Sequence, residues 1–185
     1  MLINHSHIVL DACCVLNFCA SGHFIEMLRA ISAQAVVTEV VRSQELLTLK
    51  RVEENVGNDV DTFEGAIEKG LIAIEDFQSE LEQNDFINYA FELGDDGESA
   101  TFAIAANRGW AVATDDKKAT SFFRQEFPHL QLLSSLDILK YYADKAQLTP
   151  SELKTLLQEI RLKGHYVANK QHHLRDWWEK SVNSS

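Results

Sequence analysis

The amino-acid sequence predicts an α/β fold, a three-layer α/β/α arrangement in which helices cover both faces of a central five-stranded parallel sheet. Short apolar segments rich in β-branched residues alternate with longer segments that have apolar residues at helical spacing. No break in composition divides the 185 residues, which are enough for one domain with a real core. Because crossovers through helices connect strands that run the same way, we expect a parallel sheet.

Five apolar segments are expected to form the strands. The first has the sequence H-I-V-L and runs directly into Asp11. The fourth has the sequence W-A-V-A and runs into Thr114, Asp115 and Asp116. In chain order, the expected strands are residues 7–11, 35–38, 71–74, 110–114 and 130–133.

Helices are expected between and after these strands. Thr38 can cap the helix after the second strand, with Glu39 at its first position. Thr149, followed by Pro150 and Glu152, has the pattern of another helix start. In chain order, the expected helices are residues 15–20, 23–31, 39–55, 63–69, 79–93, a helix opened by the acidic turn 94–98 and ended by Gly109, 117–127, 135–146, 150–164 and a last helix containing Trp177 and Trp178.

The composition is that of an ordinary globular protein, with 45% hydrophobic and 24% charged residues. A net charge of −11 argues against a broad basic surface for duplex DNA, although a metal site with a few cations still suits a phosphate. No run of about 18 apolar residues predicts a membrane span, and the N-terminal residues lack the features of a signal peptide. We therefore expect a cytoplasmic protein with no membrane segment.

The sequence contains few motifs that indicate other chemistries. Cys13, Cys14 and Cys19 are odd in number and lack the spacing of a zinc site, so we expect reduced thiols in the core. The glycine-rich phosphate-binding and dinucleotide-binding motifs and the G-x-S-x-G nucleophile motif do not occur.

Four acidic positions are expected at one edge of the sheet, where the carboxyl ends of parallel strands meet helix N-termini. They are Asp11, Glu39, Glu98, and Asp115 with Asp116. Carboxylates gathered at one place repel each other and are costly to desolvate. A hard divalent cation with oxygen ligands commonly resolves that repulsion.

Each of these acids also has a simpler explanation. An Asp after a strand often caps a turn, which would account for Asp11. An acid in the first turn of a helix is favoured by the helix dipole, which would account for Glu39 and for the acidic turn with Asp95, Asp96 and Glu98. The predicted site therefore depends on the placement of all four positions at one edge.

Four segments in this order resemble the PIN domain family. They are V-L-D-A-C-C-V-L-N-F from residue 9, V-V-T-E-V-V from residue 36, G-D-D-G-E-S-A-T-F-A-I-A from residue 94 and V-A-T-D-D-K-K-A from residue 112. The resemblance covers about residues 7–135, and the tail L-L-Q-E-I-R-L-K-G-H-Y-V-A is similar to the ending of one prokaryotic branch. PIN domains are metal-dependent ribonucleases and include the VapC-like toxins of toxin–antitoxin pairs. The resemblance implies a nuclease domain over residues 1–146 and a helical C-terminal extension, 147–185, packed on it.

The resemblance also implies roles for individual residues. The family's first aspartate corresponds to Asp11, its helix-start acid to Glu39 and its third acid to Glu98. Its last acid corresponds to Asp116 if the T-x-D pattern of many members applies, or to Asp115 as in other members.

One departure concerns the polar residue that many members carry soon after the first aspartate. This chain has Cys13 and Cys14 there, with Asn17 a helical turn later as a substitute.

The implied activity is endoribonuclease cleavage with Mg²⁺ or Mn²⁺ held by Asp11, Glu98 and Asp115 or Asp116. The metal lowers the pKa of a bound water that attacks the phosphodiester, and Glu39 holds a second metal or orients the water. Lys117 and Lys118 either contact the RNA backbone or are solvated helix-start residues. Single-stranded or looped RNA is the expected substrate, with an antitoxin protein and a second copy of the chain as expected partners.

Two other functions remain open at this point. A catalytically inactive PIN-like binding or regulatory module would fit the strong negative charge and the missing polar residue after Asp11. A phosphoryl-transfer or receiver-like domain also gathers carboxylates at a sheet edge, but Ala12 and Cys13 replace the D-x-D pattern of the haloacid dehalogenase type. We expect His172 and His173 to lie outside any metal site, and Trp177 and Trp178 to dock the last helix or contact a partner rather than stack on bases.

Overall fold

The five strands form an all-parallel sheet in the order β3-β2-β1-β4-β5. The computed structural model describes residues 3–45 and 59–183. The strands are β1 (His7–Leu10), β2 (Gln34–Thr38), β3 (Ile72–Glu75), β4 (Ala111–Ala113) and β5 (Leu132–Leu133). The predicted α/β fold with a five-stranded parallel sheet is confirmed, and the strand bounds differ from the predicted ones by at most two residues.

The helices follow the predicted order. They are α1 (Ala12–Ala20), α2 (Phe24–Ala30), α4 (Asp59–Glu68), α5 (Glu80–Leu93), α6 (Asp96–Arg108), α7 (Lys117–Glu126), α8 (Ser135–Lys145), α9 (Pro150–Lys163) and α10 (Arg175–Asn183). Where a helix over 39–55 was predicted, Val41–Glu45 form a π-helical turn, η1, and residues 46–58 lie outside the described part. Thr38 Oγ1 accepts a hydrogen bond from the backbone N–H of Val41, as expected of a cap.

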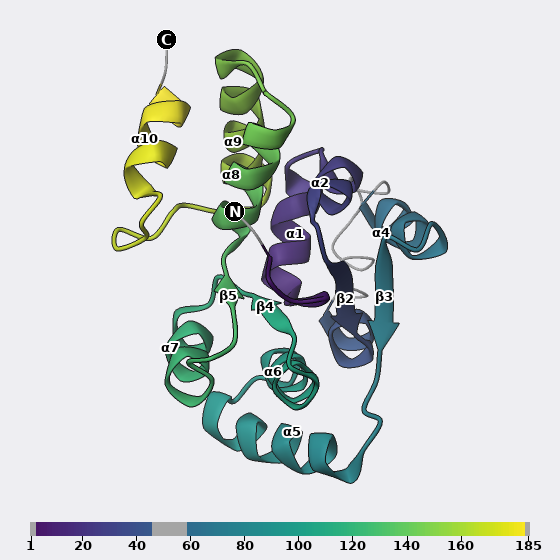
Figure 1. Ribbon diagram of the computed structural model, residues 1–185. Coiled ribbons are helices and arrows are strands. Elements are labelled where there is room, and N and C mark those ends of the chain that lie inside the picture. Colours follow the sequence, from purple (N-terminus) through teal and green to yellow (C-terminus); the bar gives the residue numbers. More distant parts are fainter. Residues whose placement is uncertain (1–2, 46–58, 184–185) are drawn as a thin grey trace.

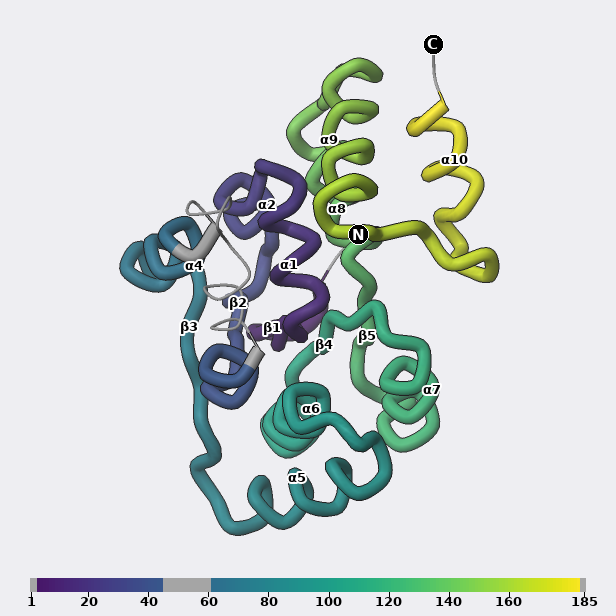
Figure 2. Tube along the Cα trace, turned by 180° about the vertical axis from the view of Figure 1, so that it is seen from behind, coloured from purple at the N-terminus to yellow at the C-terminus, as the bar shows by residue number. Residues whose placement is uncertain are grey.

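Alternate residues along the strands pack into separate apolar layers. On one face, Ile8 and Leu10 of β1 join a core cluster with residues of α1, α2, α8 and α9. On the other face, Val9 packs with Phe102 of α6 and Phe123 of α7. The alternation of strand side chains therefore produces three layers, with helices on both sides of the sheet (Figure 1, and from behind in Figure 2).

The strand order reverses direction between β1 and β4. The chain first builds outward from β1 to β2 and β3, then crosses over to place β4 on the other side of β1. Helices leaving neighbouring strands at such a point diverge, so a crevice forms outside the carboxyl ends of the two strands. Asp11 follows β1 and Thr114, Asp115 and Asp116 follow β4, so both acidic segments border this crevice.

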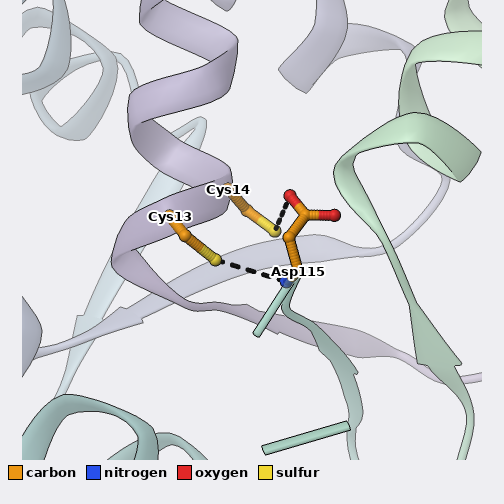
Figure 3. A group of neighbouring side chains, drawn as sticks. All are labelled: Cys13, Cys14 and Asp115. Atoms are coloured by element: carbon orange, nitrogen blue, oxygen red, sulfur yellow. Dashed lines mark hydrogen bonds between the residues drawn. The ribbon is translucent and has the colours of Figure 1, made fainter. Parts of the chain in front are cut away.

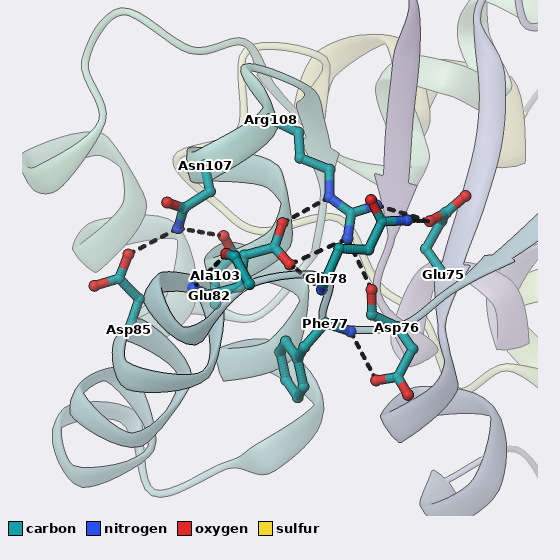
Figure 4. Close-up of polar contacts among 10 residues, drawn as sticks. Glu75, Asp76, Phe77, Gln78, Glu82, Asp85, Ala103, Asn107 and Arg108 are labelled. Atoms are coloured by element: carbon teal, nitrogen blue, oxygen red, sulfur yellow. Dashed lines mark hydrogen bonds and ion pairs between the residues drawn. The ribbon is translucent and has the colours of Figure 1, made fainter.

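A buried ion-pair network fixes α5 against α6 (Figure 4). The guanidinium of Arg108 donates to Glu82 Oε1 at 2.7 Å, to Glu75 Oε2 at 2.7 Å and to the carbonyl of Asp76. Arg108 holds the pKa of Glu82 below its usual range, even though burial alone would raise it. Glu75 ends β3, the edge strand of the sheet, and Glu82 lies in the first turn of α5, so these carboxylates are not part of the switch between β1 and β4.

The C-terminal elements pack on the same core as the sheet. Leu156, Leu157 and Ile160 of α9 and Trp178 of α10 belong to the apolar cluster that contains Leu10 of β1. Thr149 and Glu152 form the predicted capping box at the start of α9. Among the described helices, none combines the length and apolar character needed to cross a membrane.

Candidate functional site

Asp11 is a buried carboxylate held by three donors. It follows β1 and is the N-cap of α1, where Oδ1 accepts from the backbone N–H of Ala12 at 2.8 Å. Oδ2 accepts from the hydroxyl of Thr114 at 2.9 Å and from the thiol of Cys13 at 3.0 Å. Only 4% of Asp11 is exposed, so the donors fix its orientation at the end of β1.

Asp115 is the second carboxylate at the switch point, and it is partly buried with its own set of donors. Its Oδ2 accepts from the side-chain amide of Asn17 at 3.0 Å, and its Oδ1 accepts from the backbone N–H of Ser135 at 3.1 Å. The same amide of Asn17 also donates to Ser135 Oγ at 3.2 Å. Residues of α1, β4 and α8, distant in sequence, therefore converge on one carboxylate.

Cys13 links the two acids. Its sulfur accepts from the backbone N–H of Asp115 at 3.3 Å while its thiol donates to Asp11. Thr114 makes a parallel connection, because its hydroxyl donates to Asp11 and accepts from the backbone N–H of Asp116 at 3.2 Å. Cys13 thus connects the Asp11 carboxylate to the backbone of Asp115, and Thr114 connects it to the backbone of Asp116.

Burial and nearby negative charges disfavour the ionised form of both carboxylates. Burial raises the pKa of Asp11, and the negative charge of Asp95 raises it further. Burial also raises the pKa of Asp115, with a contribution from the charge of Asp11. The hydrogen bonds to each group act in the opposite direction without cancelling the effect of burial. Among the described residues, no Lys, Arg or His forms an ion pair with either acid.

The other predicted site acids lie further out. Glu39 follows β2 with its side chain 43% exposed and forms an ion pair with Arg42 at 3.6 Å. Asp116 is exposed and caps α7, accepting from the backbone N–H of Ala119 at 2.8 Å. Glu98 lies half-buried in the first turn of α6.

The structure therefore places Asp11 and Asp115 at the ends of neighbouring strands but does not gather the whole predicted set. Within residues 3–45 and 59–183, no three of the five predicted acids have carboxylate oxygens that all lie within 4.8 Å of one another. Asp95 caps α6 by accepting from the backbone N–H of Glu98, as its helix-start position indicated.

Asn17 occupies the place that sequence analysis gave it as a substitute polar residue. Its position depends on Gly164 at the end of α9, because a Cβ there would lie 2.9 Å from Asn17 Oδ1 and 2.8 Å from the carbonyl of Ile160. Gly164 has an ordinary φ of −85°, so close packing of α9 against α1 is what requires glycine here.

A cleft of about 1430 Å³ opens over Asp115. Its floor includes Cys13, Asn17, Thr114 and Asp115. One wall is α7, and the other is the C-terminal strap, residues 164–174, which connects α9 to α10. Both walls carry exposed cations, which are Lys117 and Arg124 on α7 and Lys170 on the strap.

The strap is fastened to α8 by two histidines. His172 Nδ1 accepts from the backbone N–H of Leu174 at 3.0 Å, so its proton lies on Nε2, which contacts Ser134 Oγ at 2.9 Å. His173 Nε2 lies 3.0 Å from Asp137 Oδ1. Although these imidazoles and Asp137 are close enough to share a cation, the donor facing Nδ1 leaves His172 no metal-binding nitrogen in this tautomer. The two histidines therefore link the strap to Ser134 and Asp137 at the start of α8.

Two thiols line the acid pair. Burial raises the pKa of Cys14 well above its usual range. The pKa of Cys13 is also raised: contact with Cys14 lowers it, but burial and the charges of Asp11 and Asp115 raise it by more. Both thiols are therefore protonated in the absence of a cation. The three cysteines are free, with Cys14 and Cys19 buried and Cys13 partly buried.

Comparisons of the chain with models of protein families, with curated proteins and with solved structures found no match. The geometry of the site therefore has to support any assignment of function.

Sequence reasoning missed several residues of the site. Ser135 and the strap come from the C-terminal third of the chain, and nothing in their local sequence indicates that they face Asp115. Thr114 was visible as the residue directly after a predicted strand, where a side chain at the carboxyl edge could be expected to contact Asp11.

Replacing Asp11 with Asn should stabilise the metal-free protein at pH 8 but not at pH 4. Folding raises the pKa of Asp11, so the ionised carboxylate is less favourable in the folded protein than in the unfolded chain. The wild-type free energy of unfolding therefore decreases as pH rises from the unfolded pKa through the raised folded pKa. The substituted amide carries no such charge, and its oxygen can still accept from the backbone N–H of Ala12. Urea denaturation in EDTA at several pH values measures the difference.

The exposed Asp61 on α4 provides the matched control. The difference in free energy of unfolding between Asp61→Asn and the wild type should not increase comparably with pH. An Asp11→Asn protein that is less stable than wild type at pH 8 would contradict the claim that the ionised Asp11 carboxylate destabilises the metal-free folded protein.

Proposed function

We propose that this chain is a Mg²⁺- or Mn²⁺-dependent endoribonuclease. The observation that carries the proposal is a pair of carboxylates outside the switch point of a parallel sheet, with Asp115 partly buried in the floor of a cleft and Asp11 buried at the end of the neighbouring strand. The resemblance of the sequence to PIN domains agrees with this placement and extends the proposal to a cytoplasmic toxin with an antitoxin partner and a homodimeric state.

The acid pair suits a hard divalent cation. Carboxylates with raised pKa values and no cationic partner among the described residues are stabilised by a positive ion, and Mg²⁺ and Mn²⁺ prefer carboxylate oxygens. A carboxylate has about four acceptor positions, and Asp11 uses three of them, so one remains for a metal. Asp11 and Asp115 would hold the ion directly.

Glu98 and Glu39 stay candidates for contacts through metal-bound water, since Mg²⁺ keeps several waters. Asp116 is the weaker candidate of the T-D-D pair, because its carboxylate is exposed and already caps α7. In this proposal the last acid of the site is Asp115.

A bound cation would supply an activated water at neutral pH and offset the charge that builds on the phosphate. The chain's own residues orient the carboxylates that hold it. Thr114, Cys13 and the backbone of Ala12 fix Asp11, while Asn17 and the backbone of Ser135 fix Asp115. Such fixed outer contacts matter because small displacements of metal ligands weaken binding and activity.

The walls of the cleft suit a phosphodiester backbone. Lys117, Arg124 and Lys170 face the cleft, and none of the ion pairs of the described residues involves them. In a chain with a net charge of −11, cations without carboxylate partners beside an acidic floor indicate a local anion-binding surface. A cleft rather than a broad basic face favours single-stranded or looped RNA.

The direct test is cleavage of a labelled single-stranded RNA with Mn²⁺, using an EDTA control. Asp11→Asn and Asp115→Asn should each reduce the rate at least about 100-fold, because each removes a ligand of the ion that offsets several kcal/mol of transition-state charge. Asp116→Asn should keep most of the activity, since Asn is as good an N-cap as Asp.

Equal losses for the variants at 115 and 116 would show that the wrong acid is assigned. Full activity of Asp11→Asn would refute the site altogether. If the wild-type chain binds Mn²⁺ but cleaves no RNA, the alternative function, a PIN-like binding or regulatory module, is favoured. The thiol of Cys13, which takes the place of a polar residue after Asp11, is consistent with that alternative.

The cationic walls make a separate prediction about affinity. In an Asp11→Asn background that leaves RNA intact, replacing Lys117, Arg124 and Lys170 together with Ala should weaken RNA binding about tenfold or more at low salt. The slope of log affinity against log salt should fall by about 2, since each phosphate contact on a single strand contributes about 0.7. Fluorescence anisotropy at several salt concentrations measures both quantities.

Lys69 gives the matched control, because it is exposed just before β3 at the opposite, amino edge of the sheet. An equal effect of Lys69→Ala, or an unchanged salt slope in the triple variant, would place the RNA elsewhere.

A further inference from the structure

We propose that Cys13, Cys14 and Asp115 form a second, mutually exclusive site for a thiophilic divalent cation such as Zn²⁺. An ion bound there would take Asp115 away from the nuclease metal and so inhibit the enzyme. The binding half of this inference stands on its own geometry, and the inhibition half rests on the proposed nuclease function.

The three ligand groups already converge (Figure 3). One carboxylate oxygen of Asp115 and the sulfurs of Cys13 and Cys14 all lie within 4.8 Å of one another. The sulfur of Cys14 lies 3.9 Å from Asp115 Oδ2 and that of Cys13 lies 3.3 Å from the backbone nitrogen of Asp115. Small shifts are enough to surround an ion whose bonds to sulfur and oxygen measure about 2.3 and 2.0–2.2 Å.

The donor set selects a different cation from the acid pair. Thiolates favour Zn²⁺ and Cd²⁺ over Mg²⁺ and Mn²⁺, whereas Asp11 with Asp115 offers only hard oxygen ligands. Two sulfurs and one oxygen leave a fourth position of a tetrahedral ion for water. Asp115 belongs to both sets, so the two ions compete for one carboxylate.

Access and support for such an ion come from named neighbours. Cys13 and Asp115 line the cleft, while Cys14 is fully buried behind them, so an ion from solvent would meet these two ligands first. Asn17 and the backbone N–H of Ser135 hold the Asp115 carboxylate, as outer contacts commonly hold metal ligands.

Cadmium alone serves as the probe, because a cadmium–thiolate bond produces an ultraviolet charge-transfer band that needs no nuclease activity. Titration of the reduced protein should give a saturable band at about one equivalent. Cys13→Ser and Cys14→Ala should each lose about half of its intensity and bind about tenfold or more weakly, and the double variant should show no band. Asp115→Asn, which keeps both thiols, should bind about tenfold more weakly with the band retained.

Cys19, a buried thiol on the same helix, is the matched control, and Cys19→Ala should leave the titration unchanged. Circular dichroism confirms that each variant is folded. A band that is absent in wild type, that persists in the double variant or that disappears in Cys19→Ala would overturn the site.

The regulatory half has its own readout in RNA cleavage with Mn²⁺. Zn²⁺ should inhibit the wild type, Mn²⁺ should relieve the inhibition, and the Zn²⁺ concentration for half inhibition should rise about tenfold or more in Cys14→Ala. Equal inhibition of both proteins would refute the regulation. If the wild type cleaves no RNA, the proposed nuclease function fails, while the cadmium titration still decides the metal site.

Discussion

The structure depends on one electrostatic constraint, which is that a buried and a partly buried carboxylate follow two neighbouring strands where the order of the sheet reverses. Asp11 and Asp115 have raised pKa values because burial opposes their charged forms, with added repulsion from Asp95 on Asp11 and from Asp11 on Asp115. Within the described part of the chain, hydrogen-bond donors and no cationic side chains hold them in place. The proposed metal ion would stabilise the folded protein by binding at this pair.

Much of the surrounding structure serves to keep this pair in place. Asn17 reaches Asp115 from α1, and the backbone of Ser135 at the start of α8 reaches it from the other side. The close approach of α9 at Gly164 confines Asn17, and the strap that follows forms a wall of the cleft. The C-terminal region is therefore part of the site as well as of the core.

The helices and strands were predictable because residues within or next to each segment determine its secondary structure. The strand H-I-V-L before Asp11, the glycine at 109 and the capping box at Thr149 each determine their own segment. The presence of Asp11 and Asp115 at one edge followed from parallel pairing of β1 with β4. The partners of Asp115 did not follow, because Ser135 and the strap reach it through tertiary packing that no nearby sequence feature encodes. The choice between Asp115 and Asp116 likewise depends on which side chain turns inward and which caps α7.

Anomalous diffraction from crystals of the protein soaked in Mn²⁺ tests the central claim most directly, because it locates the ion without reference to any activity. A peak bounded by the carboxylates of Asp11 and Asp115, and absent in crystals of Asp11→Asn, is the predicted result. A Mn²⁺-soaked crystal with no peak between these two side chains, or with its peak at another group of acids, would contradict the account.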